Sequence, residues 1–156
     1  LLKTRIIMYL KPDSVLIGFD FGTKKTGVAI AQCITRTAST LKAVQMKQEH
    51  PNWNQLDQII NDYRPDFAII GSPGKTSQET SALTEKVENF ASVIEKRYTM
   101  PTKLFDESYS TKLAKEELKN QREAGILNKK IKKGQVDSMA AKILLEQWLE
   151  RHLMHS

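Results

Sequence analysis

The chain has 156 residues, a formal net charge of +6 and an apolar content of 40%, which suits one globular domain with a single core. No apolar run approaches the roughly 20 residues of a membrane span, and a single cysteine, Cys33, excludes a disulfide framework within the chain. We therefore expect a cytoplasmic protein without a membrane partner, in which Cys33 is buried or half-buried and is not a nucleophile. Residues 1–13 are expected to be an N-terminal extension whose sequence is compatible with disorder, and residues 14–153 one domain.

The pattern at the start of this domain predicts three strands. Residues 15–19 are apolar and lead into Asp20, residues 22–27 form a turn bounded by glycines, and residues 28–31 resume the apolar pattern. Two apolar segments joined by such a turn are typical of a β-hairpin. A third strand is predicted over residues 37–44.

The next part of the chain alternates helices and strands. Asn52 is a candidate N-cap for a helix whose apolar residues recur at helical spacing and which Pro65 ends. Residues 67–70 are continuously apolar, as in a strand that is buried on both faces. Thr76 and the glutamate three residues later form a capping box, which predicts a second helix.

The last third of the chain adds one strand and two helices. Residues 103–105 form a short apolar strand, Ser110 or Thr111 opens a helix, and the final helix is predicted to start near Val136 and to run to about Leu153. Alternating strands and helices require right-handed crossovers and parallel pairing, whereas the first hairpin is antiparallel. The sequence therefore predicts an α/β fold with a mixed five-stranded sheet, an antiparallel front hairpin and helices on both faces.

Three carboxylates occupy comparable positions in this predicted fold. Asp20 ends the first strand, Glu107 follows residues 103–105, and Asp137 heads the apolar stripe of the last helix. Because ligands bind at the carboxyl ends of parallel strands, we expect these three side chains to converge there. Each acid alone also fits a structural role, as a turn residue, a solvated loop acid or a helix N-terminal acid.

Converging carboxylates have a specific chemical consequence. They repel one another unless a cation lies between them, and oxygen ligands favour Mg²⁺ or Mn²⁺ over zinc. Two such ions can activate a water molecule and stabilise the leaving oxygen when a phosphodiester is hydrolysed. The acids therefore predict a metal-dependent hydrolase with Asp20, Glu107 and Asp137 as catalytic and metal-binding residues.

Basic residues gather in one segment. Residues 119–133 contain six basic side chains and one acid, and such a cluster attracts phosphate backbones, although it also fits a solvated loop. The turn after Asp20 and the loop after residues 67–70 offer further phosphate contacts. The candidate nucleic-acid contacts are Thr23, Lys24, Lys25, Lys75, Lys129, Lys130, Lys132 and Lys133.

Three motifs, in the same order, resemble those of the YqgF (RuvX) family. Residues 18–29 (GFDFGTKKTGVA) resemble its opening motif, residues 106–111 (DESYST) its second, and residues 133–141 (KGQVDSMAA) its third. The resemblance extends over about residues 14–150. It implies an RNase H-like fold and a cytoplasmic bacterial protein. The family is described both as Holliday-junction resolvases, similar to RuvC, and as nucleases that trim the 5′ end of the small-subunit ribosomal RNA precursor.

The resemblance assigns the family's catalytic acids to Asp20, Glu107 and Asp137, and the chain departs from the pattern at two other places. Ser108 stands where the family has arginine, which removes a bidentate phosphate contact. Ser72 follows Gly71 where the family has leucine, and many RNase H-like nucleases carry an acid near the end of that strand. Glu107 would therefore have to supply the middle carboxylate.

Three functions remain open from the sequence. The favoured one is a metal-dependent nuclease, a monomer or a homodimer, whose first substrate is structured RNA at the 5′ end of pre-16S rRNA and whose second is branched DNA. A small ATP-binding protein is suggested by Asp20, Gly22 and Thr23, but a chain of 156 residues has no room for two closing lobes. A non-catalytic nucleic-acid-binding module that assists ribosome assembly is the third.

Overall fold

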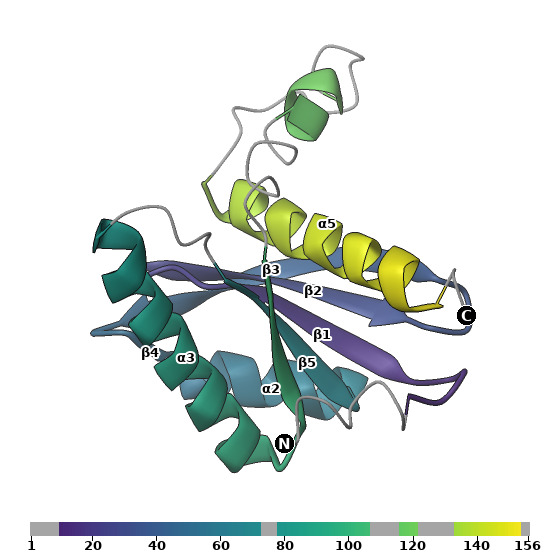
Figure 1. Ribbon diagram of the computed structural model, residues 1–156, viewed down its shortest axis with the longest axis horizontal. Helices are drawn as coiled ribbons and strands as arrows, with labels where there is room; N and C mark the ends of the chain where they lie inside the picture. The colour runs from purple at the N-terminus through teal and green to yellow at the C-terminus, as the bar shows by residue number, and fades with distance from the viewer. Residues whose placement is uncertain (1–9, 73–77, 107–115, 122–132, 154–156) are drawn as a thin grey trace.

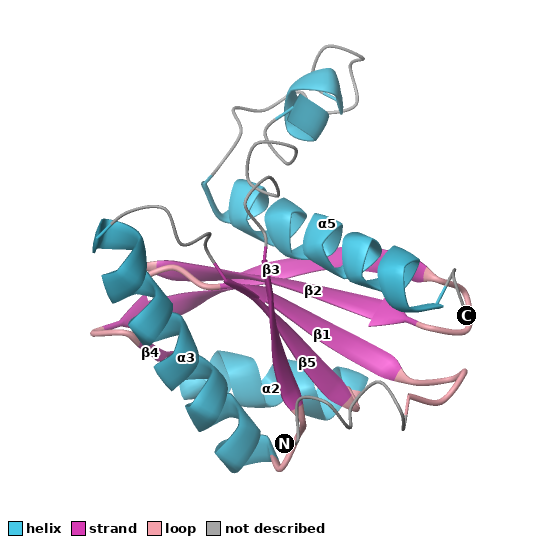
Figure 2. Cartoon of the chain, in the orientation of Figure 1, coloured by secondary structure: helices cyan, strands magenta, loops and turns pink. Residues whose placement is uncertain are grey.

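The structure is a computed structural model that describes residues 10–72, 78–106, 116–121 and 133–153 (Figure 1). These residues form one mixed sheet with helices packed on both of its faces, and Figure 2 shows α5 on one side of the sheet and α2 and α3 on the other. This arrangement confirms the predicted fold class. No helix within the described ranges is long and apolar enough to span a membrane.

The sheet has six strands in the order β4-β3-β2-β1-β5-β6. The first four strands along the chain pair antiparallel, whereas β1, β5 and β6 pair parallel. The five predicted strands are present, and β4, which has only two residues, was not predicted. The strands are β1 (Val15–Asp20), β2 (Lys25–Gln32), β3 (Thr37–Lys47), β4 (His50–Pro51), β5 (Phe67–Ser72) and β6 (Thr102–Asp106).

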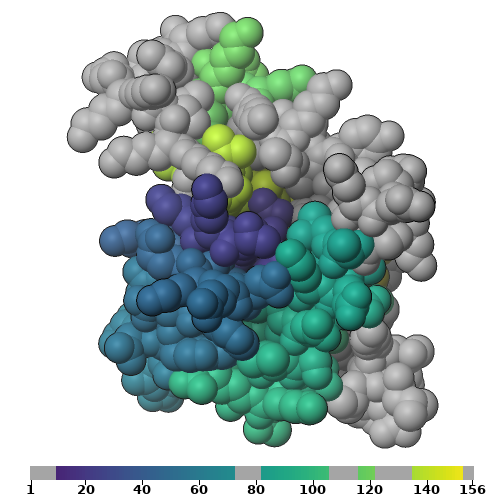
Figure 3. Space-filling model, turned by 90° about the vertical axis from the view of Figure 1, so that its left-hand side faces the viewer, coloured from purple at the N-terminus to yellow at the C-terminus, as the bar shows by residue number. Residues whose placement is uncertain are grey.

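Helices α2 (Trp53–Tyr63) and α3 (Gln78–Tyr98) cover the same face of the sheet. The predicted N-cap of α2 is confirmed, since the side chain of Asn52 accepts a hydrogen bond from the Gln55 N–H at 3.2 Å. The core beneath these helices contains large side chains, including Phe19 of β1 and Phe90 of α3. Residues 40–60 lie beside α3 on one surface (Figure 3), and the Glu49 carboxylate contacts the Lys86 ammonium at 2.9 Å.

Helix α5 (Lys133–Leu153) covers the opposite face. It starts three residues before the predicted position near Val136, so Lys133 belongs to the helix rather than to the preceding loop. The predicted stripe is confirmed, because Ala141, Leu145 and Trp148 are fully buried against β1, β2 and β5. This contact fixes the N-terminal turns of α5 over the start of β2.

Candidate active site

Gly27 is the point at which β1, β2 and α5 meet. Asp20 of β1 is the register partner of Gly27, and directly opposed residues of antiparallel strands lie about 4.5–5.5 Å apart. A Cβ atom on Gly27 would lie only 2.0 Å from the Asp137 carbonyl oxygen. The backbones of β2 and α5 are therefore in direct contact, and Asp20 and Asp137 lie next to the same glycine.

Asp20 lies on the face of the sheet that α5 covers. Alternate residues of a strand point to the same face, and a Cβ on Gly18 would approach Leu145 Cγ of α5 at 2.6 Å. Asp20, two residues further along β1, shares that face. Its side chain is buried, with an exposed fraction of 8%, and Asp137 is half-buried. The fold thus brings together two of the three predicted acids from opposite ends of the chain.

The third predicted acid, Glu107, lies outside the described residues. It follows Asp106, which ends β6 and is in register with Ser72 of β5. Because β1, β5 and β6 are parallel, their carboxyl ends share one edge of the sheet. Among the residues that the structure describes, no group of three or more His, Cys, Asp or Glu side chains could hold a metal ion.

The turn after Asp20 is held by Thr26. The Gly22 N–H donates to the Thr26 hydroxyl at 3.3 Å, and that hydroxyl lies 3.4 Å from the Gly22 carbonyl oxygen. A Cβ on Gly22 would come within 2.2 Å of the Lys25 carbonyl oxygen, so glycine is required there. The turn exposes Thr23 and Lys24 to solvent, and Lys25 is half-buried at the start of β2.

Of the other predicted nucleic-acid contacts, the structure places only the backbone of Lys133. Lys75, Lys129, Lys130 and Lys132 lie outside the described residues, and Lys133 is the first residue of α5.

Cys33 is a buried residue, as predicted, with an exposed fraction of 5%. Burial raises the pKa of its thiol, and the negative charge of Asp66 raises it further. A raised pKa disfavours the thiolate, which is the nucleophilic form. Cys33 is therefore not a candidate nucleophile.

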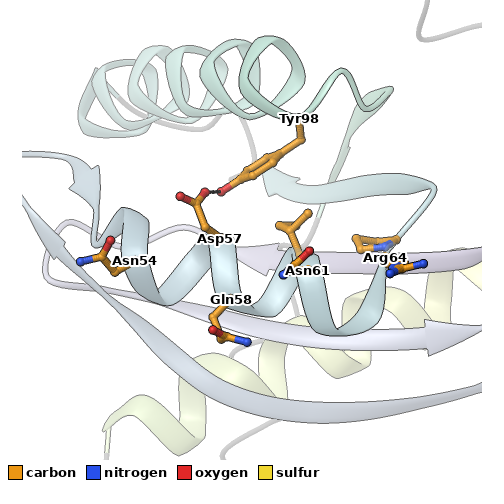
Figure 4. A pocket seen from close by; sticks show the side chains of 8 residues that line it. Asn54, Asp57, Gln58, Asn61, Arg64 and Tyr98 are labelled. Carbon is orange, nitrogen blue, oxygen red and sulfur yellow. Dashed lines mark hydrogen bonds between the residues drawn. The ribbon is translucent and has the colours of Figure 1, made fainter.

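A polar hollow of about 590 Å³ lies on the opposite face, along α2 (Figure 4). The Asp57 carboxylate there accepts hydrogen bonds from Arg97 at 3.0 and 2.8 Å and from the Tyr98 hydroxyl at 2.5 Å. The hydrogen bonds from Arg97 lower the pKa of Asp57 to about 2, and burial and the Asp57 carboxylate raise the pKa of Tyr98. The Arg97 guanidinium also lies 4.2 Å above the Trp53 ring. These contacts join α2 to the end of α3, so Asp57 has a structural role.

Ser138 was not among the site residues predicted from the sequence. Its hydroxyl accepts a hydrogen bond from the Val28 N–H at 3.2 Å, between α5 and β2. A signal was present, because Ser138, Ala141 and Leu145 are spaced i, i+3 and i+7, which places the hydroxyl on the buried face of the helix. A polar side chain on such a face needs a hydrogen-bond partner in the core.

Solved structures of Holliday junction resolvases share the fold of this chain. T. thermophilus RuvC, in complex with a Holliday junction substrate, matches with a TM-score of 0.54 and 15% identity over 88% of this chain and 94% of that chain. The yeast mitochondrial Holliday junction resolvase matches with a TM-score of 0.54 and 11% identity over 99% of this chain and 86% of its own. In this chain Asp20 and Asp137 both lie beside Gly27, at the edge where β1 ends, and the fold is RNase H-like.

Within that class the chain belongs to the RuvX family, whose model is described as "Holliday junction resolvase" and matches residues 14–151. A Legionella pneumophila (strain Paris) protein named "Putative pre-16S rRNA nuclease" is 38% identical over 140 residues, which are 90% of this chain and 98% of the relative. An Escherichia coli O139:H28 protein of the same name is 38% identical over 139 residues, covering 89% and 98%. These matches confirm the YqgF (RuvX) family that the three motifs indicated.

Proposed function

We propose that this chain is a nuclease that hydrolyses phosphodiester bonds with divalent cations held by Asp20, Asp137 and Glu107. The proposal is supported by the position of Asp20, which pairs with Gly27 in the sheet, and of Asp137, whose backbone lies over the same glycine. Two acidic residues that separate elements bring next to one glycine favour a cation between their carboxylates, because like charges otherwise repel. Glu107 would complete the ligand set from the end of β6.

The donor set fits Mg²⁺ or Mn²⁺, which prefer carboxylate oxygens. Bound in a pair, such ions supply an activated water and charge stabilisation for the leaving oxygen. The fold positions both acids. Asp20 is held by the pairing of β1 with β2, and Asp137 by the contact of α5 with Gly27. Thr23 and Lys24, exposed on the adjoining turn, offer a hydroxyl and an ammonium group to a phosphate.

The proposed substrate is the 5′ leader of pre-16S rRNA. This substrate is supported by the relatives named "Putative pre-16S rRNA nuclease", which align with this chain over 98% of their own length. Lys25, Lys75, Lys129, Lys130, Lys132 and Lys133 are proposed as further contacts to the RNA backbone, since lysines bind phosphates as point charges. Monomer and homodimer are both compatible with this substrate.

A four-way DNA junction is the second candidate substrate, and the description of the family model favours it. Paired cuts across a junction require two active sites, so this function would need the homodimer.

The test compares Asp20→Asn with Asp57→Asn. Both substitutions remove one carboxylate charge, but Asp57 belongs to the ion pair with Arg97 on the far face. With Mg²⁺ or Mn²⁺ and a pre-16S leader RNA, Asp20→Asn should lower the cleavage rate by roughly 10²-fold or more, without weakening RNA binding. Asp57→Asn should cleave like the wild type.

The same assay separates the alternatives. Cleavage of a four-way DNA junction but not of the RNA would assign the second substrate. Retained cleavage by Asp20→Asn would contradict the proposed site. RNA binding without cleavage of either substrate, with or without metal, would favour the non-catalytic assembly factor.

A further inference from the structure

Ser138 and Val28 form a hydrogen bond directly beside the contact between Gly27 and Asp137. The Val28 N–H donates to the Ser138 hydroxyl at 3.2 Å, and the bond is buried. Ser138 has an exposed fraction of only 2%, and Val28 is fully buried. Because Gly27 and Val28 are consecutive in β2, and Asp137 and Ser138 consecutive in α5, the two contacts join the same two short segments.

The bond lies where the pairing of β2 with β3 is irregular. Thr26 pairs with Val44, but Val28 pairs with Leu41, so two residues of β3 oppose Gly27. Irregularities of this kind take backbone groups out of the regular ladder and re-aim the strand. A buried N–H at such a place needs an acceptor, and α5 supplies it through Ser138.

The two contacts constrain different movements of α5. The packing of the Asp137 backbone on Gly27 sets how closely the helix approaches the sheet, but packing alone has little directional preference. A hydrogen bond weakens steeply when its angle departs from linear, so the bond from Val28 to Ser138 also sets the rotation and the axial position of the helix. The side chain of Asp137 moves with that rotation.

We infer that Ser138 is a positioning residue that holds the Asp137 carboxylate in the place where it can share a cation with Asp20. The inference rests on the proposed function in one respect, that these acids bind a divalent ion. The new element is that the hydrogen bond between the Ser138 hydroxyl and the Val28 N–H sets the orientation of Asp137.

Ser14→Ala provides a matched control for Ser138→Ala. Ser14 is also a buried serine, with an exposed fraction of 3%, and its hydroxyl accepts a hydrogen bond from the Lys11 N–H at 2.9 Å. It directly precedes β1, at the end of the strand opposite to Asp20. Both substitutions delete one buried hydroxyl that accepts from a backbone N–H, so a general loss of stability should affect both variants alike.

The experiment measures Mn²⁺ affinity by calorimetry on the full chain. Losing a group that orients a metal ligand weakens binding by about 10–100-fold, and we expect Ser138→Ala to raise the dissociation constant for Mn²⁺ by about tenfold, with Ser14→Ala unchanged. Cleavage by Ser138→Ala should recover at higher Mn²⁺ concentration, because the ligands themselves remain. Unchanged Mn²⁺ affinity in Ser138→Ala, or equal weakening in Ser14→Ala, would overturn the inference.

Amide hydrogen exchange separates this inference from the proposed function, because it needs neither metal nor substrate. In the metal-free chain, the Val28 amide should exchange roughly tenfold faster in Ser138→Ala than in the wild type or in Ser14→Ala. If the wild type binds Mn²⁺ but cleaves nothing, the nuclease proposal fails. A lower Mn²⁺ affinity of Ser138→Ala would then still support the role of Ser138. An unchanged exchange rate at Val28 would overturn that role whatever the protein cleaves.

Discussion

The two faces of the sheet differ in how the helices meet the strands near the end of β1. On the face that α2 and α3 cover, large rings fill the space: Phe90 meets Phe19 edge-to-face with ring centroids 5.5 Å apart and Phe21 at 5.2 Å. Under the N-terminal turns of α5, by contrast, the Asp137 backbone lies directly on Gly27. Both faces bury apolar side chains, including Trp148 of α5, but the N-terminal turns of α5 add a close contact between two backbones. Asp20 and Asp137 lie at this backbone contact.

This difference predicts that a deletion in the aromatic face changes stability without changing chemistry. Phe90→Ala should lower the free energy of unfolding by about 3–5 kcal/mol, because it leaves a cavity between α3 and the sheet. The cleavage rate per folded molecule, measured below the unfolding temperature, should stay within about twofold of the wild type, since Asp20 and Asp137 lie across the sheet. Chemical denaturation and a cleavage assay on the same preparation check both expectations. A large loss of activity in the folded variant would show that packing at Phe90 also affects the cleavage site.

Substitutions of Gly27 and Gly18, which both lie under α5, test whether the backbone contact positions Asp137. In Gly27→Ala the new methyl group meets the Asp137 backbone, which cannot rotate away, whereas in Gly18→Ala it meets the Leu145 side chain, which can change rotamer. We expect overpacking to lower stability by about 1–3 kcal/mol in each, but only Gly27→Ala should also lose most of its cleavage activity and Mn²⁺ affinity. Equal activity in the two variants would show that the close approach at Gly27 is not what positions Asp137.

The smallest expected effect belongs to the ion pair on the aromatic face. The hydrogen bonds from Arg97 lower the pKa of Asp57 from 3.8 to about 2. A lowered pKa in the folded state gives stability that is present above the unfolded pKa and is lost as the pH falls through the folded one. The stability difference between wild type and Asp57→Asn should therefore be constant above pH 3.8 and shrink as the pH falls towards about 2. Thermal unfolding at several pH values measures it, and a difference that grows on acidification would contradict the assignment.

Much of the fold could be predicted because its signals are local. The apolar run that leads into Asp20, the cap at Asn52 and the stripe of Ala141, Leu145 and Trp148 each depend on nearby residues and on simple periodicity. Strand β4 could not be predicted, since two residues carry no periodicity. The start of α5 at Lys133 was missed because the basic residues there suggested a loop.

The contacts at the candidate active site could not be predicted in this way, because they depend on how distant elements pack. The sequence predicted Gly27 as the end of a turn, but not its contact with the Asp137 carbonyl, because that contact depends on how α5 docks on β2. Ser138 was passed over although its spacing placed it on the buried face. Its partner, the Val28 N–H, needs an acceptor at an irregularity between β2 and β3 that only the three-dimensional register reveals.

The proposed metal site requires Asp20 and Asp137 to share a divalent cation. The most direct measurement is a crystal structure of the protein soaked in Mn²⁺, with anomalous scattering to locate the ion. We predict a peak at coordination distance from carboxylate oxygens of both Asp20 and Asp137, with Glu107 as a further ligand and with the peak absent from Asp20→Asn crystals. A structure in which Mn²⁺ binds elsewhere, or in which no ion contacts both carboxylates, would contradict the assignment of Asp20 and Asp137 as metal ligands.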